Sequence, residues 1–164
     1  MRIMFSGLLA SGLLCAGIAA AQPCAKPPDV FAFAVASLKS KLMVTALTCN
    51  QQDRYNDFVQ HFRGDLMTQE HALHAYFARA FGGGRAQQEH DDYITSLANT
   101  HSETGVQQGT WFCQMNVGIF DEVLALRNGA DLANYAAAKS LPQPVDIVAC
   151  PLPTRTAQAG ATRR

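Results

Sequence analysis

The fold is decided by helical periodicity, which first appears in residues 29–49, DVFAFAVASLKSKLMVTALTC. The large apolar residues of this stretch recur every three or four positions, so they share one face of a helix. They are Phe31, Val35, Leu38, Leu42 and Ala46. Pro27 and Pro28 stand just before the stretch, at a place where helices often begin. We therefore predict a helix over residues 29–48.

The same period continues along the chain. Further helices are predicted at residues 53–66, 68–81, 86–103, 107–127 and 131–140. Asp53 and Thr68 are expected as N-caps of the first two, since their side chains can accept a hydrogen bond from the first turn. The stretch 107–127 is apolar around more than half of its circumference, which is typical of a helix at the centre of a bundle. We expect the all-α class, as an irregular disulfide-stapled bundle of five to six helices.

The first 21 residues have the features of a secretory signal peptide. Arg2 supplies a positive start, an almost wholly apolar run follows from Ile3, and Ala19–Ala21 offers the small residues of a cleavage site. The most apolar part of this run is short for a membrane span, which needs about 20 apolar residues. We expect cleavage after Ala21, export to the bacterial periplasm or the exterior, and no stable membrane insertion afterwards.

Four cysteines, Cys24, Cys49, Cys113 and Cys150, remain after this cleavage. An even number of cysteines in an exported chain indicates two disulfide bonds. Three pairings are open. We favour Cys24–Cys150 with Cys49–Cys113, because the first pair flanks the predicted core and domain termini often lie close together. The chain has no Cys-x-x-Cys and no zinc-type cysteine spacing, so the cysteines are expected to be structural.

One domain is expected between the signal peptide and the end of the chain. Residues 22–150 carry all of the predicted helices and end in an extended segment over 145–150. Residues 151–164 are rich in Thr, Ala and Arg and lack an apolar period, which is typical of a disordered tail.

The charge of the chain narrows the classes of partner. Lysine plus arginine and aspartate plus glutamate number 13 each, so the formal net charge is zero. A neutral chain without a basic stripe is a poor match for DNA, RNA or an anionic membrane. Nucleic acid is therefore not expected as a partner.

His71 and His74 are the first candidates for chemistry. They are three residues apart on a predicted helix, so both imidazoles can point the same way and offer two ligands to zinc or copper. Glu70 and His61 are near in sequence. The pattern lacks the Glu-x-x-His of di-iron bundles and the His-Glu-x-x-His of zinc proteases. We favour two surface histidines beside an apolar stripe, and we expect no metal and no cofactor.

The helix predicted over residues 86–103 carries two further candidates. Acids in the run Glu89–Asp92 are stabilised near a helix N-terminus by the helix dipole, which accounts for them without a function. A polar stripe on the same helix, beside its apolar face, is what a shallow ligand groove would look like. The candidate ligand-binding residues are Tyr55, Asn56, Asp92, Asn99, Ser102 and Trp111.

No catalytic signature stands out in the chain. It has neither the Gly-x-Ser-x-Gly nucleophile elbow nor a phosphate-binding loop. We therefore expect an exported helical protein that binds an envelope protein or a small ligand without catalysing a reaction. The alternative is a small metal-dependent enzyme or hydrolase that uses His71 and His74, or the run Glu89–Asp92.

Overall fold

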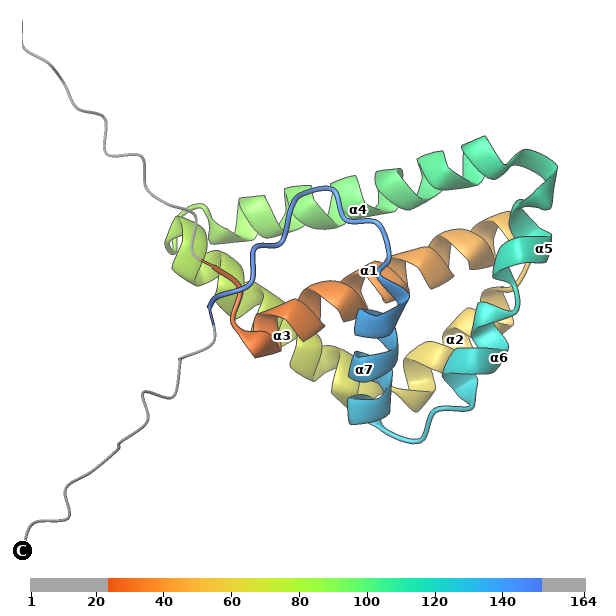
Figure 1. The fold of residues 1–164 in the computed structure, drawn as a ribbon, viewed down its shortest axis with the longest axis horizontal. Coiled ribbons are helices and arrows are strands. Elements are labelled where there is room, and N and C mark those ends of the chain that lie inside the picture. Colours follow the sequence, from red (N-terminus) through yellow and green to blue (C-terminus); the bar gives the residue numbers. More distant parts are fainter. Residues whose placement is uncertain (1–23, 152–164) are drawn as a thin grey trace, which may run out of the picture.

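The computed structural model describes residues 24–151, which form an all-α protein (Figure 1). The predicted signal peptide, residues 1–21, and all but the first residue of the predicted tail, residues 151–164, lie outside the described residues. The helices are α1 Pro27–Cys49, α2 Gln52–His61, α3 Arg63–Phe81, α4 Ala86–Gln108, the 3₁₀ helix η1 Gly109–Trp111, α5 Phe112–Asn116, α6 Ile119–Leu124 and α7 Gly129–Lys139. The predicted all-α class is confirmed.

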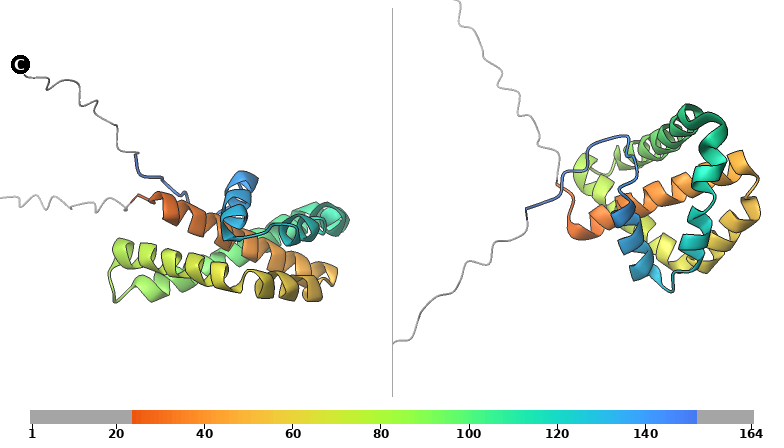
Figure 2. Two further views of the ribbon diagram at one scale, coloured as in Figure 1. Left: turned by 90° about the horizontal axis from the view of Figure 1, so that it is seen from below. Right: turned by 45° about the vertical axis from the view of Figure 1, so that its right-hand side comes forward.

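The first helix, α1, is the centre of the bundle. It begins at Pro27, and the Asp29 carboxylate accepts a hydrogen bond of 2.7 Å from the backbone N–H of Lys26, which fixes its first turn. The helices α3, α4 and α7 pack most extensively on α1, and α2 and α5 contact it as well. Figure 1 shows α4 alongside α1, and the left view of Figure 2 shows α7 and the α2–α3 row on opposite faces of α1.

Burial on several sides gives a physical reason for the apolar composition of α1. A helix with neighbours around most of its circumference needs apolar side chains around most of its circumference. Of the helices in residues 24–151, α1 alone is long and apolar enough to cross a membrane, judged by length and composition only. Most of its most apolar part is buried inside the protein, where it forms the core.

The boundary between the second and third helices differs from the prediction. The chain bends at Phe62, which is buried, and α3 begins at Arg63. Thr68, predicted as an N-cap, lies inside α3, where its hydroxyl donates a hydrogen bond of 3.0 Å to the carbonyl oxygen of Gly64. A threonine can make this bond to the preceding turn in mid-helix, so its presence does not mark a helix start.

The prediction of one central helix over residues 107–127 is wrong. The chain forms η1, α5 and α6 there, and Trp111 and Met115 are 64% and 66% exposed. Gly109 has φ +54° and ψ −132°, a conformation that glycine adopts far more readily than other residues, and it ends α4. A side chain on Gly105 would meet the ring of Phe112 at 3.3 Å, so this glycine allows the turn to fold back closely.

The core has two clusters, both built on α1. The first cluster joins α1 to α2, α6 and α7, and its buried members are Val35, Leu38, Leu42, Ala46, Phe58, Phe62, Phe120, Val123, Leu132, Ala133 and Ala136. The second cluster joins α1 to α3 and α4, and its buried members are Ala32, Phe33, Leu73, Phe77, Ala86, Tyr93 and Leu97. The first cluster is mostly aliphatic with phenylalanine, whereas the second is rich in aromatic rings.

The chain leaves α7 as an irregular segment, residues 141–150, which we name the C-terminal strap. Figure 1 shows it passing from α7 towards α4 and then to the start of α1. At its end, the backbone N–H groups of Ala25 and Cys150 donate hydrogen bonds of 2.8 Å to the carbonyl oxygens of Val148 and Ala25. The strap therefore returns the chain to its described beginning.

The two disulfides are Cys24–Cys150 and Cys49–Cys113, the pairs favoured from the sequence. The sulfur atoms are 1.99 Å and 2.08 Å apart, respectively. The first bond fastens the strap to the residues before α1. The second joins the end of α1 to α5, so it holds the irregular turn after α4 against the central helix.

Candidate functional site

The strap and the α3–α4 pair enclose a groove of about 760 Å³, which we name the strap groove. Its lining comes from all three elements and from α1: Phe33, Tyr76, Phe77, Phe81, Arg85, Glu89, Asp92, Tyr93, Ser96 and residues 144–148. This volume is in the range of about 300–1,000 Å³ that small-molecule sites occupy. It is larger than two other hollows on the described part of the chain, which measure about 10 Å³ and 120 Å³.

Aromatic rings form the floor of the strap groove. Phe33 meets Tyr76 and Tyr93 edge to face, with ring centroids 4.8 Å and 5.2 Å apart. Phe77 and Phe81 are stacked at 5.9 Å, with an interplanar angle of 18°. Because Phe33, Phe77 and Tyr93 belong to the second core cluster, the floor is a continuation of the core.

The strap spans the groove between two anchors. At one end the Gln143 side chain accepts a hydrogen bond of 2.7 Å from the Tyr93 hydroxyl and donates one of 3.2 Å to the carbonyl oxygen of Phe33. At the other end lie the Cys24–Cys150 disulfide and the backbone hydrogen bonds of Ala25. Residues 144–147, between the anchors, make no backbone hydrogen bond within the described residues.

Charged side chains lie along the rim of the groove. Arg85 forms an ion pair with Glu89, and its guanidinium also lies 5.7 Å from the ring centroid of Phe81. No ion pair among residues 24–151 neutralises Asp92 or Asp146, and both are exposed. Because Arg85 and Glu89 neutralise each other, Asp92 and Asp146 leave the rim with a net negative charge.

The buried hydroxyl of Ser37 binds the beginning of the strap, next to α7, to the core. The Ser37 hydroxyl donates a hydrogen bond of 3.0 Å to the carbonyl oxygen of Pro142, so it must accept its second bond, also of 3.0 Å, from Nε2 of His101. His101 is fully buried, and burial, aided by the nearby charge of Lys41, lowers its pKa to about 4. The imidazole is therefore neutral, with its proton on Nε2.

A second, smaller hollow of about 120 Å³ lies between α1, α2, α3 and α4. Tyr55 and Glu70 are among its lining residues, with apolar side chains that include Met43 and Leu97. The Oγ of Ser40, another lining residue, is buried and has no hydrogen-bond partner within the described part of the chain. Burial raises the pKa of the Tyr55 hydroxyl, which keeps this residue neutral.

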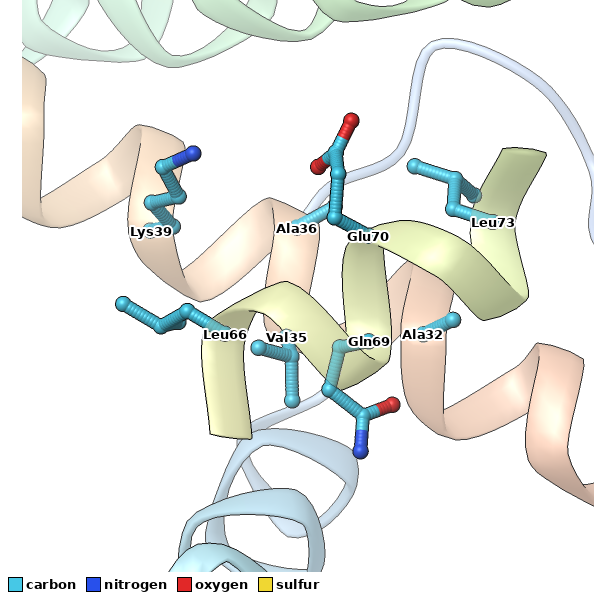
Figure 3. A pocket seen from close by; sticks show the side chains of 8 residues that line it. All are labelled: Ala32, Val35, Ala36, Lys39, Leu66, Gln69, Glu70 and Leu73. Atoms are coloured by element: carbon cyan, nitrogen blue, oxygen red, sulfur yellow. The ribbon is translucent and has the colours of Figure 1, made fainter. Parts of the chain in front are cut away.

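Glu70, His74 and His90 form the one group of three metal-ligating side chains found in the described residues. Oε1 of Glu70 lies 2.8 Å from Nε2 of His90 and 3.6 Å from Nε2 of His74. The two imidazole rings are stacked with centroids 3.9 Å apart. Figure 3 shows Glu70 on α3, beside α1, with its carboxylate pointing away from both helices towards α4. We name these three residues the histidine cluster.

The residues proposed from the sequence do not gather in one site. Asp92 lies at the strap groove and Tyr55 at the smaller hollow. Four others, Asn56, Asn99, Ser102 and Trp111, are exposed and line neither hollow. Of the two candidate metal ligands, His74 belongs to the histidine cluster, whereas His71 is exposed and outside it.

The run Glu89–Asp92 is also divided by the helix. Glu89 and Asp92 face the strap groove, while His90 is buried against Glu70 and Asp91 is exposed. The Asp91 carboxylate accepts hydrogen bonds from Gln87 and from Nδ1 of His90, and these bonds lower its pKa. His90 and Asp92 therefore have different neighbours, which speaks against a joint acid–base pair.

The sequence did not predict most of the strap groove. It also did not predict that His90 lies beside Glu70 and His74. The strap residues 144–148 are far in sequence from Phe33 and Tyr76, and no local pattern links them. The pairing of His74 with His90 had a signal, because Gly82 lies midway between them and a helical hairpin that turns there places them opposite each other.

Comparison with known proteins gives no relative. No family model, no curated protein and no solved structure matches this chain.

Proposed function

We propose that this is an exported binding protein that holds a small organic cation with an apolar body in the strap groove. The observation that supports the proposal is the strap groove itself, which has an aromatic floor and an acidic rim. Its third side is the backbone of residues 144–147, which makes no hydrogen bond to other backbone groups of the described residues. Export is supported by the apolar N-terminal sequence and the two disulfides, both consistent with an exported protein. The bacterial periplasm is the proposed location.

The floor of the groove favours an apolar, preferably flat, ligand body. Phe81 is only partly buried, so part of its ring surface is available to a ligand, while the Phe77 ring is stacked on it from the core side. Burial of apolar area contributes about 25 cal/mol per Å². Such a floor provides affinity without selecting strongly among apolar groups.

The rim supplies the preference for a positive charge. Asp92 on α4 and Asp146 on the strap are both available to a cation, and the faces of aromatic rings attract cations as well. The Arg85 guanidinium lies over the Phe81 ring of this floor, which supports a preference for cations. An anionic ligand would meet two uncompensated carboxylates.

The proposal is tested by isothermal titration calorimetry of the oxidised protein with three probes of similar shape: 2-phenylethylammonium, 2-phenylethanol and 3-phenylpropanoate. We expect the cation to bind about tenfold more tightly than the anion, since exposed carboxylates contribute up to about 1 kcal/mol each and 1.4 kcal/mol is tenfold. The neutral probe should lie between them.

Two variants test whether the cation preference comes from the carboxylates of the rim or from the overall charge of the protein. Asp92→Asn with Asp146→Asn should remove most of the cation preference and leave the affinity for 2-phenylethanol unchanged. Asp57→Asn, at an exposed position of α2 that does not line the groove, is the matched control and should change nothing. Equal affinity for all three probes, or a preference that survives the double substitution, would overturn the proposal.

A further inference from the structure

We infer that the histidine cluster is a metal site, in which Glu70, His74 and His90 bind one Zn²⁺ ion between α3 and α4. This site is separate from the strap groove and does not depend on the function proposed for that groove. Two imidazoles and one carboxylate are a ligand set that zinc accepts, and three protein ligands leave a fourth position open.

The donor atoms are nearly at the spacing that zinc requires. With zinc–ligand bonds of about 2.0–2.1 Å and tetrahedral geometry, two donor atoms lie about 3.3 Å apart. Glu70 Oε1 is 2.8 Å and 3.6 Å from the two Nε2 atoms, and all three donors lie within 4.8 Å of one another. The stacked imidazole rings of His74 and His90 must turn apart about their side-chain torsions before both Nε2 lone pairs can point at one ion.

His90 carries a second, independent sign of a missing ligand. Its side chain is only 6% exposed, and its Nε2 atom has no hydrogen-bond partner within the described residues although Glu70 is close. The carboxylate oxygen is therefore near Nε2 but outside the direction of its N–H or lone pair. Since a metal ion binds along that lone pair, the direction a zinc ion would use is not taken by Glu70.

Asp91 sets His90 up as a ligand through its other nitrogen. Asp91 Oδ1 lies 3.2 Å from Nδ1 of His90, and because a carboxylate only accepts, the proton is on Nδ1. In the neutral ring, Nε2 then carries the lone pair that a metal ion binds. Gln87 holds this carboxylate in turn with a hydrogen bond of 2.9 Å. Carboxylate–histidine pairs of this kind orient the ligands of known zinc sites.

The ligands are held on two packed helices, α3 and α4. Glu70 and His74 are one turn apart on α3, and His90 is held on α4 by an edge-to-face contact with Phe77, at 5.7 Å and 89°. Glu70 and His74 are 38% and 39% exposed at their side chains, so an ion can reach the site from solvent. An ion there would also tie α3 to α4.

The test is zinc binding by the tag-free, oxidised protein, measured by competition with a chromophoric chelator and with Zn²⁺ alone as the probe. We expect one ion per chain. Loss of a ligand in His74→Ala or Glu70→Gln should weaken zinc affinity by about 100-fold, at least as much as the loss of an outer-shell partner. The matched control, His71→Ala, removes an exposed histidine three residues away on the same helix and should leave affinity unchanged.

A second measurement uses the unaltered protein, so that misfolding of a variant cannot obscure the result. Zn²⁺ should shift the imidazole NMR resonances of His74 and His90 and leave those of His61, His71 and His101 in place. Binding of zinc that ignores both ligand substitutions, shifts on His61 or His71 instead, or no binding at one equivalent would each overturn the inference.

Discussion

The two core clusters on either side of α1 are covered in different ways. The first cluster is enclosed by the helices α2, α6 and α7, and its buried members are all aliphatic residues or phenylalanine. The second cluster is roofed by α3, α4 and the irregular strap, and the buried imidazole of His90 lies against its Phe77 ring. A cover of packed helices leaves little space, whereas a strap held only at its ends leaves the groove.

This difference separates stability from binding. Side chains of the first cluster are expected to matter for folding alone. Groups around the second cluster carry both proposed sites, the strap groove and the histidine cluster. Substitutions in matched pairs, one from each side of α1, should therefore change different measured quantities.

The disulfides give the largest expected effects. They close loops of 126 and 64 residues, for which chain entropy predicts roughly 5 and 4 kcal/mol of stability. Both double substitutions, Cys24→Ser with Cys150→Ser and Cys49→Ser with Cys113→Ser, should lower the urea midpoint markedly. Only the first frees an anchor of the strap, so only the first should also weaken binding of 2-phenylethylammonium. Equal weakening by both pairs would contradict the role given to the strap.

A pair of phenylalanines compares the two sides directly. Phe58 is fully buried in the first cluster, and Phe58→Ala should cost about 3–5 kcal/mol of unfolding free energy. Phe81 is only partly buried in the groove, so Phe81→Ala should cost less, roughly 1 kcal/mol. Calorimetry should show the reverse order for the probe, with binding weakened by Phe81→Ala alone. If Phe81→Ala left binding intact, the aromatic floor would not be the site.

The anchor at Ser37 predicts a smaller, pH-dependent effect. The pKa of His101 is about 4 in the folded protein, against an ordinary value of 6.5. Between these two pH values the imidazole is protonated in the unfolded chain and neutral in the folded protein. The resulting stability is present above pH 6.5 and is lost as the pH falls towards 4. We expect a loss of about 2 kcal/mol between pH 7.5 and 4.5.

The control for this effect is His101→Gln, which keeps a donor for Ser37 and does not titrate. Its urea unfolding should show a smaller loss of stability over the same pH interval. The carboxylates of Asp91 and Glu122, whose pKa values are also lowered, are present in both proteins and cancel in the difference. An identical loss in the variant would show that His101 is not responsible.

Much of the fold follows from local patterns in the sequence. Periodicity predicted the helices α1, α4 and α7, because it depends only on residues close in sequence. The even number of cysteines, together with their positions at the ends of the predicted core, indicated the two disulfide pairs. The break after α4 was not predicted, because it depends on Gly109 taking a positive φ and on Phe112 packing over Gly105. The apolar pattern of residues 107–127 is therefore interrupted by tertiary contacts.

The sites were less predictable than the helices. Asp92 and His74 were singled out by residue type, but the partners that make them parts of a site come from elsewhere in the chain. The strap reaches Phe33 and Tyr93 through contacts of Gln143, which lies 110 and 50 residues away from them. Only the helical hairpin at Gly82 offered a usable signal, since it places His74 opposite His90.

The most direct measurement is to map where 2-phenylethylammonium binds, from the backbone NMR shifts of the oxidised protein. The shifts should be confined to the strap residues 144–148 and to the facing parts of α3 and α4. Resonances of α2, α6 and α7 should stay in place. Shifts centred on those three helices, or none in the strap at saturation, would contradict the assignment of binding to the strap side of α1.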